Sequence, residues 1–308
     1  MNNAGLVLIG ILGIGILAKW SGRLTPNEGA ALSVVIFNLT IPATGFMALI
    51  EVRLDQSALF LPLIALVVPL VLLLIAYLME LRTKTNADER VRGVFMAGVT
   101  LANVGYFAFP VFQTYFGNLG LSRIALYNIG TSLAAQTITY AVAYNYGLKS
   151  TSQGKATIFS WQNLRGVLLA PPIWGVVAAV VCNLLTIPIP GLILSILDTL
   201  KEVNTPLVIL MLASYLNVTF KHRRLLVLGI VIRIAIGFSV GWIFAWLFHL
   251  SPFDRFVAAA ASGMPVGMSV LIFSASENLD TEFAATFITL SILICLVLVI
   301  ILFPLVRI

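Results

Sequence analysis

Ten apolar runs follow one another along this chain, each close to the length that crosses a lipid bilayer as a helix. A membrane-spanning helix needs about 20 mostly apolar residues. Hydrophobic residues make up 60% of the 308 residues and charged residues only 10%, whereas a soluble domain carries about 25% charged residues. The composition therefore predicts an all-α polytopic membrane protein and excludes a soluble enzyme and a nucleic-acid-binding protein. The runs cover residues 4–20, 29–50, 57–80, 93–112, 124–147, 167–185, 198–220, 225–248, 255–275 and 283–306.

The cations in the short connections predict how the chain is oriented in the membrane. With the N-terminus outside, 12 of the 18 Lys and Arg residues fall in connections on the inner side and four on the outer side. Such an excess is typical of the cytoplasmic side. We therefore expect a multi-pass protein of the plasma membrane, the inner membrane of a bacterium, with both termini outside. The inner cations are Lys19, Arg23, Arg82, Lys84, Arg90, Arg92, Lys149, Lys155, Arg165, Lys221, Arg223 and Arg224.

The runs divide into two halves of five, residues 1–148 and 167–308, joined by a short cytoplasmic linker at 149–166. An odd number of helices in the first half makes the second half insert upside down. The arrangement therefore predicts two inverted five-helix repeats, which bind substrate near the midplane, where helices are broken.

Proline and glycine interrupt the fourth and ninth runs near their middles. Backbone freed by a helix break inside a membrane must line protein or a wet cavity. Proline suits the first turn of a helix, so we expect the second half-helices to begin near Pro110 and Pro265, with their N-termini facing the midplane. Those ends carry a partial positive charge that favours an anion. The predicted substrate contacts on the two breaks are Asn103, Val104, Gly105, Tyr106, Pro110, Gly263, Met264, Pro265 and Val266.

Further candidate contacts are Asn38, Asn204 and Gln136. Asn38 precedes Pro42 in the second run, and Asn204 precedes Pro206 in the seventh. Each asparagine contacts the ligand or caps the kink in its own helix. Gln136 belongs to a polar stripe in the fifth run, together with Asn128, Thr131 and Thr137. This stripe faces a cavity or joins helices.

Arg233 lies nine residues beyond Arg224, about 13–14 Å deep in the eighth run. A charge at that depth marks a functional site or a buried pair in most proteins. Two interpretations stay open: a contact to the substrate anion, or an anchor that binds main-chain carbonyls. Asp198, Lys201 and Glu202 lie at the outer mouth if their helix begins near Asp198, which we favour. Lys201 lies near mid-depth if that helix begins at Gly191.

The sequence contains no motif of an intramembrane enzyme, no P-loop and no metal-binding spacing. Its two cysteines, Cys182 and Cys295, stand alone in apolar runs. We therefore expect no enzymatic activity, no cofactor and no ATPase of its own.

The stretch from Asn103 to Pro110 resembles the N-x-G-x-x-G-x-P signature of the auxin efflux carrier family, whose bacterial members are often described as malate or organic-acid permeases. Three more segments resemble helices of the same family: residues 206–216 resemble its seventh helix, 261–265 its ninth and 289–291 its tenth. Arg233 falls where the family often has a basic residue. The chain departs from the pattern at Ala108 and Ala213, where glycine is usual.

The resemblance implies ten helices, with broken helices 4 and 9 crossing at the midplane. It also implies a scaffold of spans one, two, six and seven, and a moving part made of the other six. The related bile-acid symporters place acidic and amide groups around this crossover to bind sodium. Spans four and nine contain no Asp or Glu here, which argues against a sodium site of that kind, although carbonyls and hydroxyls remain available.

The leading functional hypothesis is a secondary transporter that moves a small organic anion, an auxin- or malate-like carboxylate, by alternating access around the helix 4 and helix 9 crossover. The alternatives are a membrane sensor or regulatory subunit of the same fold, a sodium-coupled symporter of the bile-acid type, and a channel. Coupling to protons or sodium stays open, and so does a homodimer.

Overall fold

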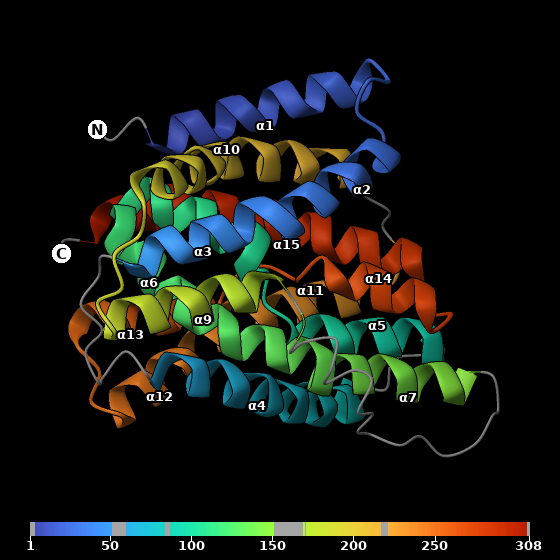
Figure 1. Cartoon of the computed structure of the whole chain (residues 1–308). Helices are drawn as coiled ribbons and strands as arrows, with labels where there is room; N and C mark the ends of the chain where they lie inside the picture. Colours follow the sequence, from blue (N-terminus) through green and yellow to red (C-terminus); the bar gives the residue numbers. More distant parts are fainter. Residues whose placement is uncertain are drawn as a thin grey trace.

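The protein is described by a computed structural model that covers residues 4–50, 60–83, 87–150, 169, 171–216 and 221–306. Within these ranges the chain forms helices and no strand. The helices form one bundle (Figure 1), in which α1 and α10 lie side by side at one edge and α4 and α12 pack together at the opposite edge. The predicted linker at 149–166 lies almost wholly outside the described residues.

The first half of the chain forms helices that follow the predicted runs closely, with extra residues at several ends. The apolar runs supply the helical segments, and capping residues begin two of them. Thr25 and Glu28 form a capping box at the start of α2, and Asp88 accepts a hydrogen bond from the Val91 amide at the start of α5. The elements are α1 (Ala4–Trp20), α2 (Pro26–Val35), η1 (Ile36–Thr40), α3 (Ile41–Ile50), α4 (Phe60–Thr83), α5 (Glu89–Thr100), η3 (Val104–Ala108), α6 (Phe109–Ala134), η4 (Ala135–Thr139) and α7 (Tyr140–Ser150).

The second half has the same general pattern of long helices and one interrupted helix. Ser251 caps α13 and Asp280 caps α15, each through a side-chain oxygen that accepts a main-chain N–H. The elements are α9 (Pro171–Leu184), α10 (Gly191–Tyr215), α11 (Arg223–Ile230), η5 (Val231–Ile236), α12 (Gly237–Leu247), α13 (Pro252–Ser262), α14 (Ser269–Ser276), α15 (Thr281–Leu302) and η6 (Phe303–Leu305).

Four helical stretches among the described residues are long and apolar enough to cross a membrane: Pro26–Ile50, Phe60–Arg82, Arg223–Leu247 and Thr281–Leu305. Gly10–Trp20 and Pro171–Leu184 are apolar but shorter. The other predicted spans are interrupted or charged: α5 and α13 end inside the bundle, and α10 carries Asp198, Lys201 and Glu202. The helical membrane architecture follows from these stretches, whereas the ten-span inverted repeat stays a prediction.

One helix begins at a place other than the one we expected. The helix that carries Asp198 starts at Gly191, with Pro190 as its N-cap, and not near Asp198. Pro188 and Pro190 flank Ile189 and prevent an earlier start, while nothing from Gly191 onward interrupts the helical hydrogen bonds before Pro206. Lys201 is therefore the eleventh residue of α10.

Candidate functional site

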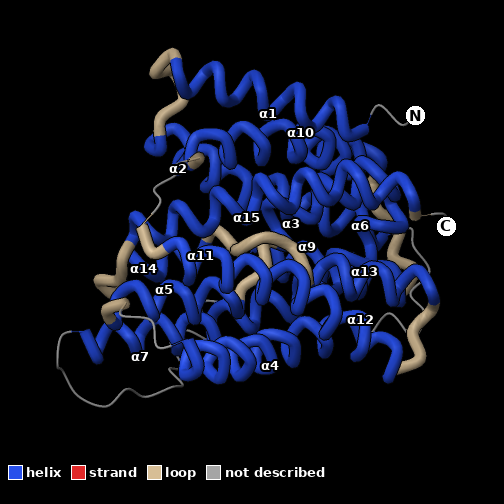
Figure 2. The backbone as a smooth tube through the Cα atoms, turned by 180° about the vertical axis from the view of Figure 1, so that it is seen from behind, coloured by secondary structure: helices blue, strands red, loops and turns tan. Residues whose placement is uncertain are grey.

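The two interrupted helices meet at their breaks in the middle of the bundle (Figure 2). Residues 101–103 separate α5 from η3, and residues 263–268 separate α13 from α14. Ala102 and Val266 pair as an isolated antiparallel bridge. The Asn103 amide donates to the Pro265 carbonyl at 2.8 Å, and the Gly267 amide donates to the Leu101 carbonyl at 2.9 Å. Each break thus satisfies main-chain groups of the other, which a non-helical segment inside a membrane requires.

The second half-helices begin at other residues than the prolines we expected. Helical backbone resumes at Val104, six residues before Pro110, and at Ser269, four residues after Pro265. Pro265 instead lies in the extended break, because its carbonyl is held by Asn103. Gly267 is needed there, since a Cβ atom on it would lie 2.7 Å from the Leu101 side chain.

Arg233 binds the ends of both first half-helices. Its side chain is 1% exposed and lies in η5. One terminal nitrogen donates to the carbonyl of Val99 at 2.8 Å, and the other donates to the carbonyl of Ser262. Val99 is in the last turn of α5 and Ser262 is the last residue of α13. A single cation therefore compensates the partial negative charge at two helix C-termini. These hydrogen bonds to main-chain carbonyls are the ones that the anchor interpretation expects.

Hydroxyl groups brace the same region. Thr100 at the end of α5 is 2.9 Å from Thr139 in η4, and Ser262 at the end of α13 is 2.7 Å from the hydroxyl of Tyr127 in α6. The Val266 amide donates to the Ser291 hydroxyl of α15 at 3.0 Å. The breaks are therefore held in place from several elements.

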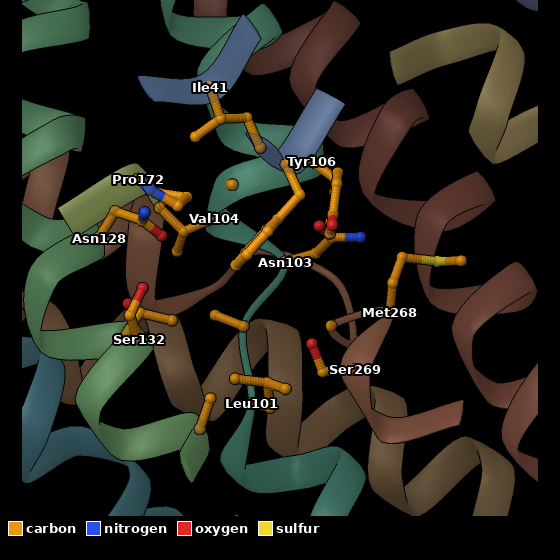
Figure 3. Close-up of a pocket in the computed structure, with 16 residues that line it drawn as sticks. Ile41, Leu101, Asn103, Val104, Tyr106, Asn128, Ser132, Pro172, Met268 and Ser269 are labelled. Atoms are coloured by element: carbon orange, nitrogen blue, oxygen red, sulfur yellow. The ribbon is translucent and has the colours of Figure 1, made fainter. Parts of the chain in front are cut away.

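A cavity of about 80 Å³ lies beside the first break, large enough for several water molecules or a small ligand. Asn103 lines it with a 2% exposed side chain, and neither its amide nitrogen nor its amide oxygen has a hydrogen-bond partner among the described residues. Figure 3 shows Asn128, Ser132 and Pro172 on one side of the break and Met268 and Ser269 on the other. The lining is Phe37, Ile41, Leu101, Ala102, Asn103, Val104, Gly105, Tyr106, Asn128, Thr131, Ser132, Ala135, Pro172, Gly267, Met268 and Ser269.

Among the described residues, the lining contains no Asp, Glu, Lys, Arg or His. Its polar character comes from amides, hydroxyls and main-chain groups. The Val104 amide donates to the carbonyl of Ala102 at 3.0 Å, and the start of the helical segment at Val104 carries the partial positive charge of a helix N-terminus. Such a site can hold a small ligand by hydrogen bonds and apolar contacts.

Four short π-helical turns surround the breaks: η1, η3, η4 and η5. Phe37, Val104 and Ala135, one from each of the first three, line the cavity, and Arg233 lies in the fourth. A π turn loosens the hydrogen-bond ladder of a helix and is frequent at functional sites. These turns have no composition signal, and the sequence interpretation missed them.

The predicted contacts divide into three groups. Asn103, Val104, Gly105 and Tyr106 line the cavity, together with Asn128 and Thr131 of the polar stripe. The predicted residues of the second break, Gly263, Met264, Pro265 and Val266, lie beside the cavity without lining it. Gln136 is half-buried in η4 and also does not line it.

Pro110, Asn38 and Asn204 lie elsewhere. Pro110 lines a separate apolar cavity of about 30 Å³. Asn38 is exposed and donates to the carbonyl of Val34 at 2.8 Å, so its side chain bonds within its own helix. Asn204 is fully buried and accepts a hydrogen bond from Thr40 at 2.6 Å.

Several lining residues were not found from the sequence: Phe37, Ile41, Ser132, Pro172, Met268 and Ser269. Ser132 follows Asn128 by one helical turn, and that spacing was a usable signal. The apolar residues of the lining have no sequence signal that distinguishes them from other core residues.

Comparison with known proteins gives two relatives over most of the chain, while no protein-family model matches it. A protein of Methanothermobacter thermautotrophicus is 25% identical over 295 residues, which cover 94% of this chain and 93% of the relative. A protein of Methanocaldococcus jannaschii is 22% identical over 289 residues, with 91% and 90% covered. Both are named as uncharacterized transporters. The chain is thus similar over nearly its whole length to proteins named as transporters, and the resemblance to the auxin efflux carrier family stays a prediction.

Proposed function

We propose that this protein is a secondary transporter of the plasma membrane that moves a small organic anion by alternating access around the two paired breaks. The unpartnered amide of Asn103 carries the proposal. Burying an unpaired amide costs about 1–3 kcal/mol, and a ligand that accepts from its nitrogen compensates that cost. The transporter names of the two relatives support the same class.

The charge of the cavity supports a carboxylate with a single negative charge. Asn103 and Asn128 supply N–H donors, and the helix N-terminus at Val104 supplies a partial positive charge. Phe37, Ile41 and Met268 surround the remaining volume with apolar surface. A second carboxylate finds no cation among the described lining residues, so we favour monocarboxylates over malate-like dicarboxylates within the carboxylate class.

The proposed mechanism uses a scaffold and a moving part. The proposed scaffold consists of α1, α2, α3, α9 and α10, which pack mainly on one another. The proposed moving part consists of α4 to α7 and α11 to α15, which also pack mainly among themselves. The cavity receives residues from both groups, for example Phe37 of η1 and Asn103 of the break. Relative movement of the two groups would expose the cavity to each side in turn. In this proposal Arg233 holds the two breaks in place. Its charge balances the two helix C-termini, so no bound sodium is needed there.

Two experiments test the proposal. A thermal-shift screen of the purified protein against small mono- and dicarboxylates identifies a ligand, because a ligand of the folded state raises the apparent melting temperature. Uptake of that ligand into proteoliposomes then distinguishes a transporter from a sensor, which binds without time-dependent accumulation. Flux that does not saturate would indicate a channel, and a strict requirement for sodium would favour the bile-acid-type symporter.

A further inference from the structure

Gly105 lies at a position where neither the backbone nor the packing requires a glycine. It is the second residue of η3 and lines the cavity beside the first break. Positive φ values, which favour glycine, occur at Gly22 and Gly117 in the described chain but not at Gly105. The nearest atoms to a Cβ on Gly105 would be Cδ1 of Ile41 at 3.7 Å and Oδ1 of Asn128 at 3.9 Å, which are ordinary van der Waals distances. An alanine would therefore fit here without strain.

The space in front of Gly105 belongs to the cavity. Ile41 and Asn128 also line the cavity, and Figure 3 shows both side chains beside it. Ile41 belongs to α3 and Asn128 to α6, so the space lies between the proposed scaffold and the proposed moving part. A methyl group takes about the room of one water molecule, which is a large share of a cavity that holds several. The missing side chain at position 105 therefore enlarges the cavity.

The other glycine of the lining, Gly267, has a different role. A Cβ atom on Gly267 would lie 2.7 Å from the Leu101 side chain and 3.3 Å from the Ala102 carbonyl oxygen, so this glycine allows the two breaks to pair closely. Gly105 permits no such contact, yet a glycine in a helical segment is less stable than an alanine, because it loses more conformational freedom on folding. Room in the cavity is the property that Gly105 provides in return.

We propose that Gly105 limits the size of the ligand that the cavity accepts, because its missing side chain leaves room for the carbon body of a small monocarboxylate beside Asn103. The inference rests on the proposed function in one respect: the ligand is a carboxylate. Alanine at position 105 removes room for the body of the ligand and leaves the polar groups of Asn103 and Asn128 in place. Gly105 therefore determines specificity by size, while the amides bind the carboxylate.

The room at position 105 can be measured before any ligand is identified. In a background with Cys182→Ala and Cys295→Ala, the substitution Gly105→Cys places a thiol in the cavity. We expect methyl methanethiosulfonate to modify this thiol, and the larger benzyl methanethiosulfonate to react more slowly, each relative to its rate with a free thiol. The control is Ala108→Cys, because Ala108 lies in the same η3 segment but is fully buried and outside the cavity lining. An unreactive thiol at position 105, equal rates at 105 and 108, or equal relative rates of the two reagents would each overturn the proposal.

Ligand selectivity tests the same limit on the binding side. Thermal shifts with acetate, propanoate and butanoate compare the wild-type protein with Gly105→Ala. We expect Gly105→Ala to weaken butanoate about tenfold more than acetate, since a hydrophobic pocket discriminates at least that much per methylene. Its melting temperature without ligand should be unchanged or slightly higher.

Gly267→Ala is the matched control, because it disturbs the paired breaks. It should lower the melting temperature and weaken all the acids alike. The same pattern from Gly105→Ala, or an unchanged preference among the acids, would overturn the size limit. A wild-type protein that binds none of these acids would instead count against the carboxylate in the proposed function. The relative thiol rates at position 105 would then decide the size limit without it.

Discussion

The buried side-chain amide of Asn103 lowers the stability of the folded protein, because no hydrogen bond among the described residues compensates for its lost hydration. Its nitrogen and oxygen are both buried and have no hydrogen-bond partner in the described part of the chain, although Asn103 lies in a break where main-chain acceptors are near. Side chains kept in this condition are common where a ligand completes the hydrogen bonding. The residue is therefore the sharpest place to test function separately from folding.

Asn103→Ala should abolish transport while leaving the melting temperature unchanged or slightly higher, because no hydrogen bond is lost. Uptake and thermal unfolding measured on the same preparation check this. Asn183→Ala is the control: Asn183 donates to the carbonyls of Leu49 and Ile50, each at 2.8 Å. Its loss should lower stability by about 1–3 kcal/mol. Wild-type uptake by Asn103→Ala would remove this residue from the site.

Arg233→Gln should destabilise the protein strongly, because the carbonyls of Val99 and Ser262 lose a charged donor, at about 1.5–3 kcal/mol per hydrogen bond. Arg233→Lys should restore part of the stability, since it keeps the charge but reaches fewer acceptors. Melting temperature and ligand affinity on both variants separate the two interpretations. Unchanged stability with weakened affinity would assign Arg233 to the substrate instead.

At the scale of single elements, much of the helix pattern could be predicted and the helix ends could not. Apolar runs at 4–20 and 57–80 became α1 and α4 almost unchanged, because length and hydropathy alone determine such helices. The interruptions near Gly105 and Pro265 were also predicted. The predicted positions at which the helices resume were wrong. They depend on the pairing of Ala102 with Val266, 164 residues apart in the chain, which one sequence does not reveal.

Gly237→Ala should destabilise the packing of α12 against α13. A Cβ at Gly237 would lie 2.4 Å from the Ser262 carbonyl oxygen and 3.0 Å from a terminal nitrogen of Arg233. The backbone must move to relieve the first contact, so we expect a loss of about 1–3 kcal/mol. Gly13→Ala in α1 meets nothing within 4 Å and should be neutral. A neutral Gly237→Ala, measured by thermal unfolding, would contradict this packing.

Pro110→Ala should leave the first break intact, because helical backbone already begins at Val104. Pro265→Ala should disturb the second break more, since it restores an N–H and helical freedom within the paired segment. Structures of the two variants, or protection of the Asn103 amide from hydrogen exchange, measure the difference. Equal disturbance by both substitutions would show that the prolines, and not the Ala102–Val266 pairing, determine where the helices break.

At the scale of the whole molecule, α6 of the proposed moving part touches α10 of the proposed scaffold along a seam that contains the Gln113–Thr205 hydrogen bond. Bridging Gln113→Cys and Thr205→Cys with a bifunctional thiol reagent, in a background with Cys182→Ala and Cys295→Ala, should stop transport, and a reductant should restore it. Lys221→Cys with Glu282→Cys is the control, because that exposed ion pair of 2.9 Å lies within the proposed moving part. Continued transport across the bridged seam would mean that α6 and α10 move together.

The four π turns also bear on how this chain tolerates changes in length. Each π turn holds about one more residue than the α-helical turn that it replaces. Removing a single residue from η3 or η5 would let the turn relax to regular α geometry, so that the helix beyond the turn keeps its register and only the side chains within the turn are displaced. Arg233 would then leave its two carbonyls, or Tyr106 the cavity, while hydropathy and helix content stayed almost the same. A one-residue deletion in these turns should therefore remove function with little damage to the fold, whereas a deletion in the middle of a regular helix such as α15 turns every later side chain by about 100°.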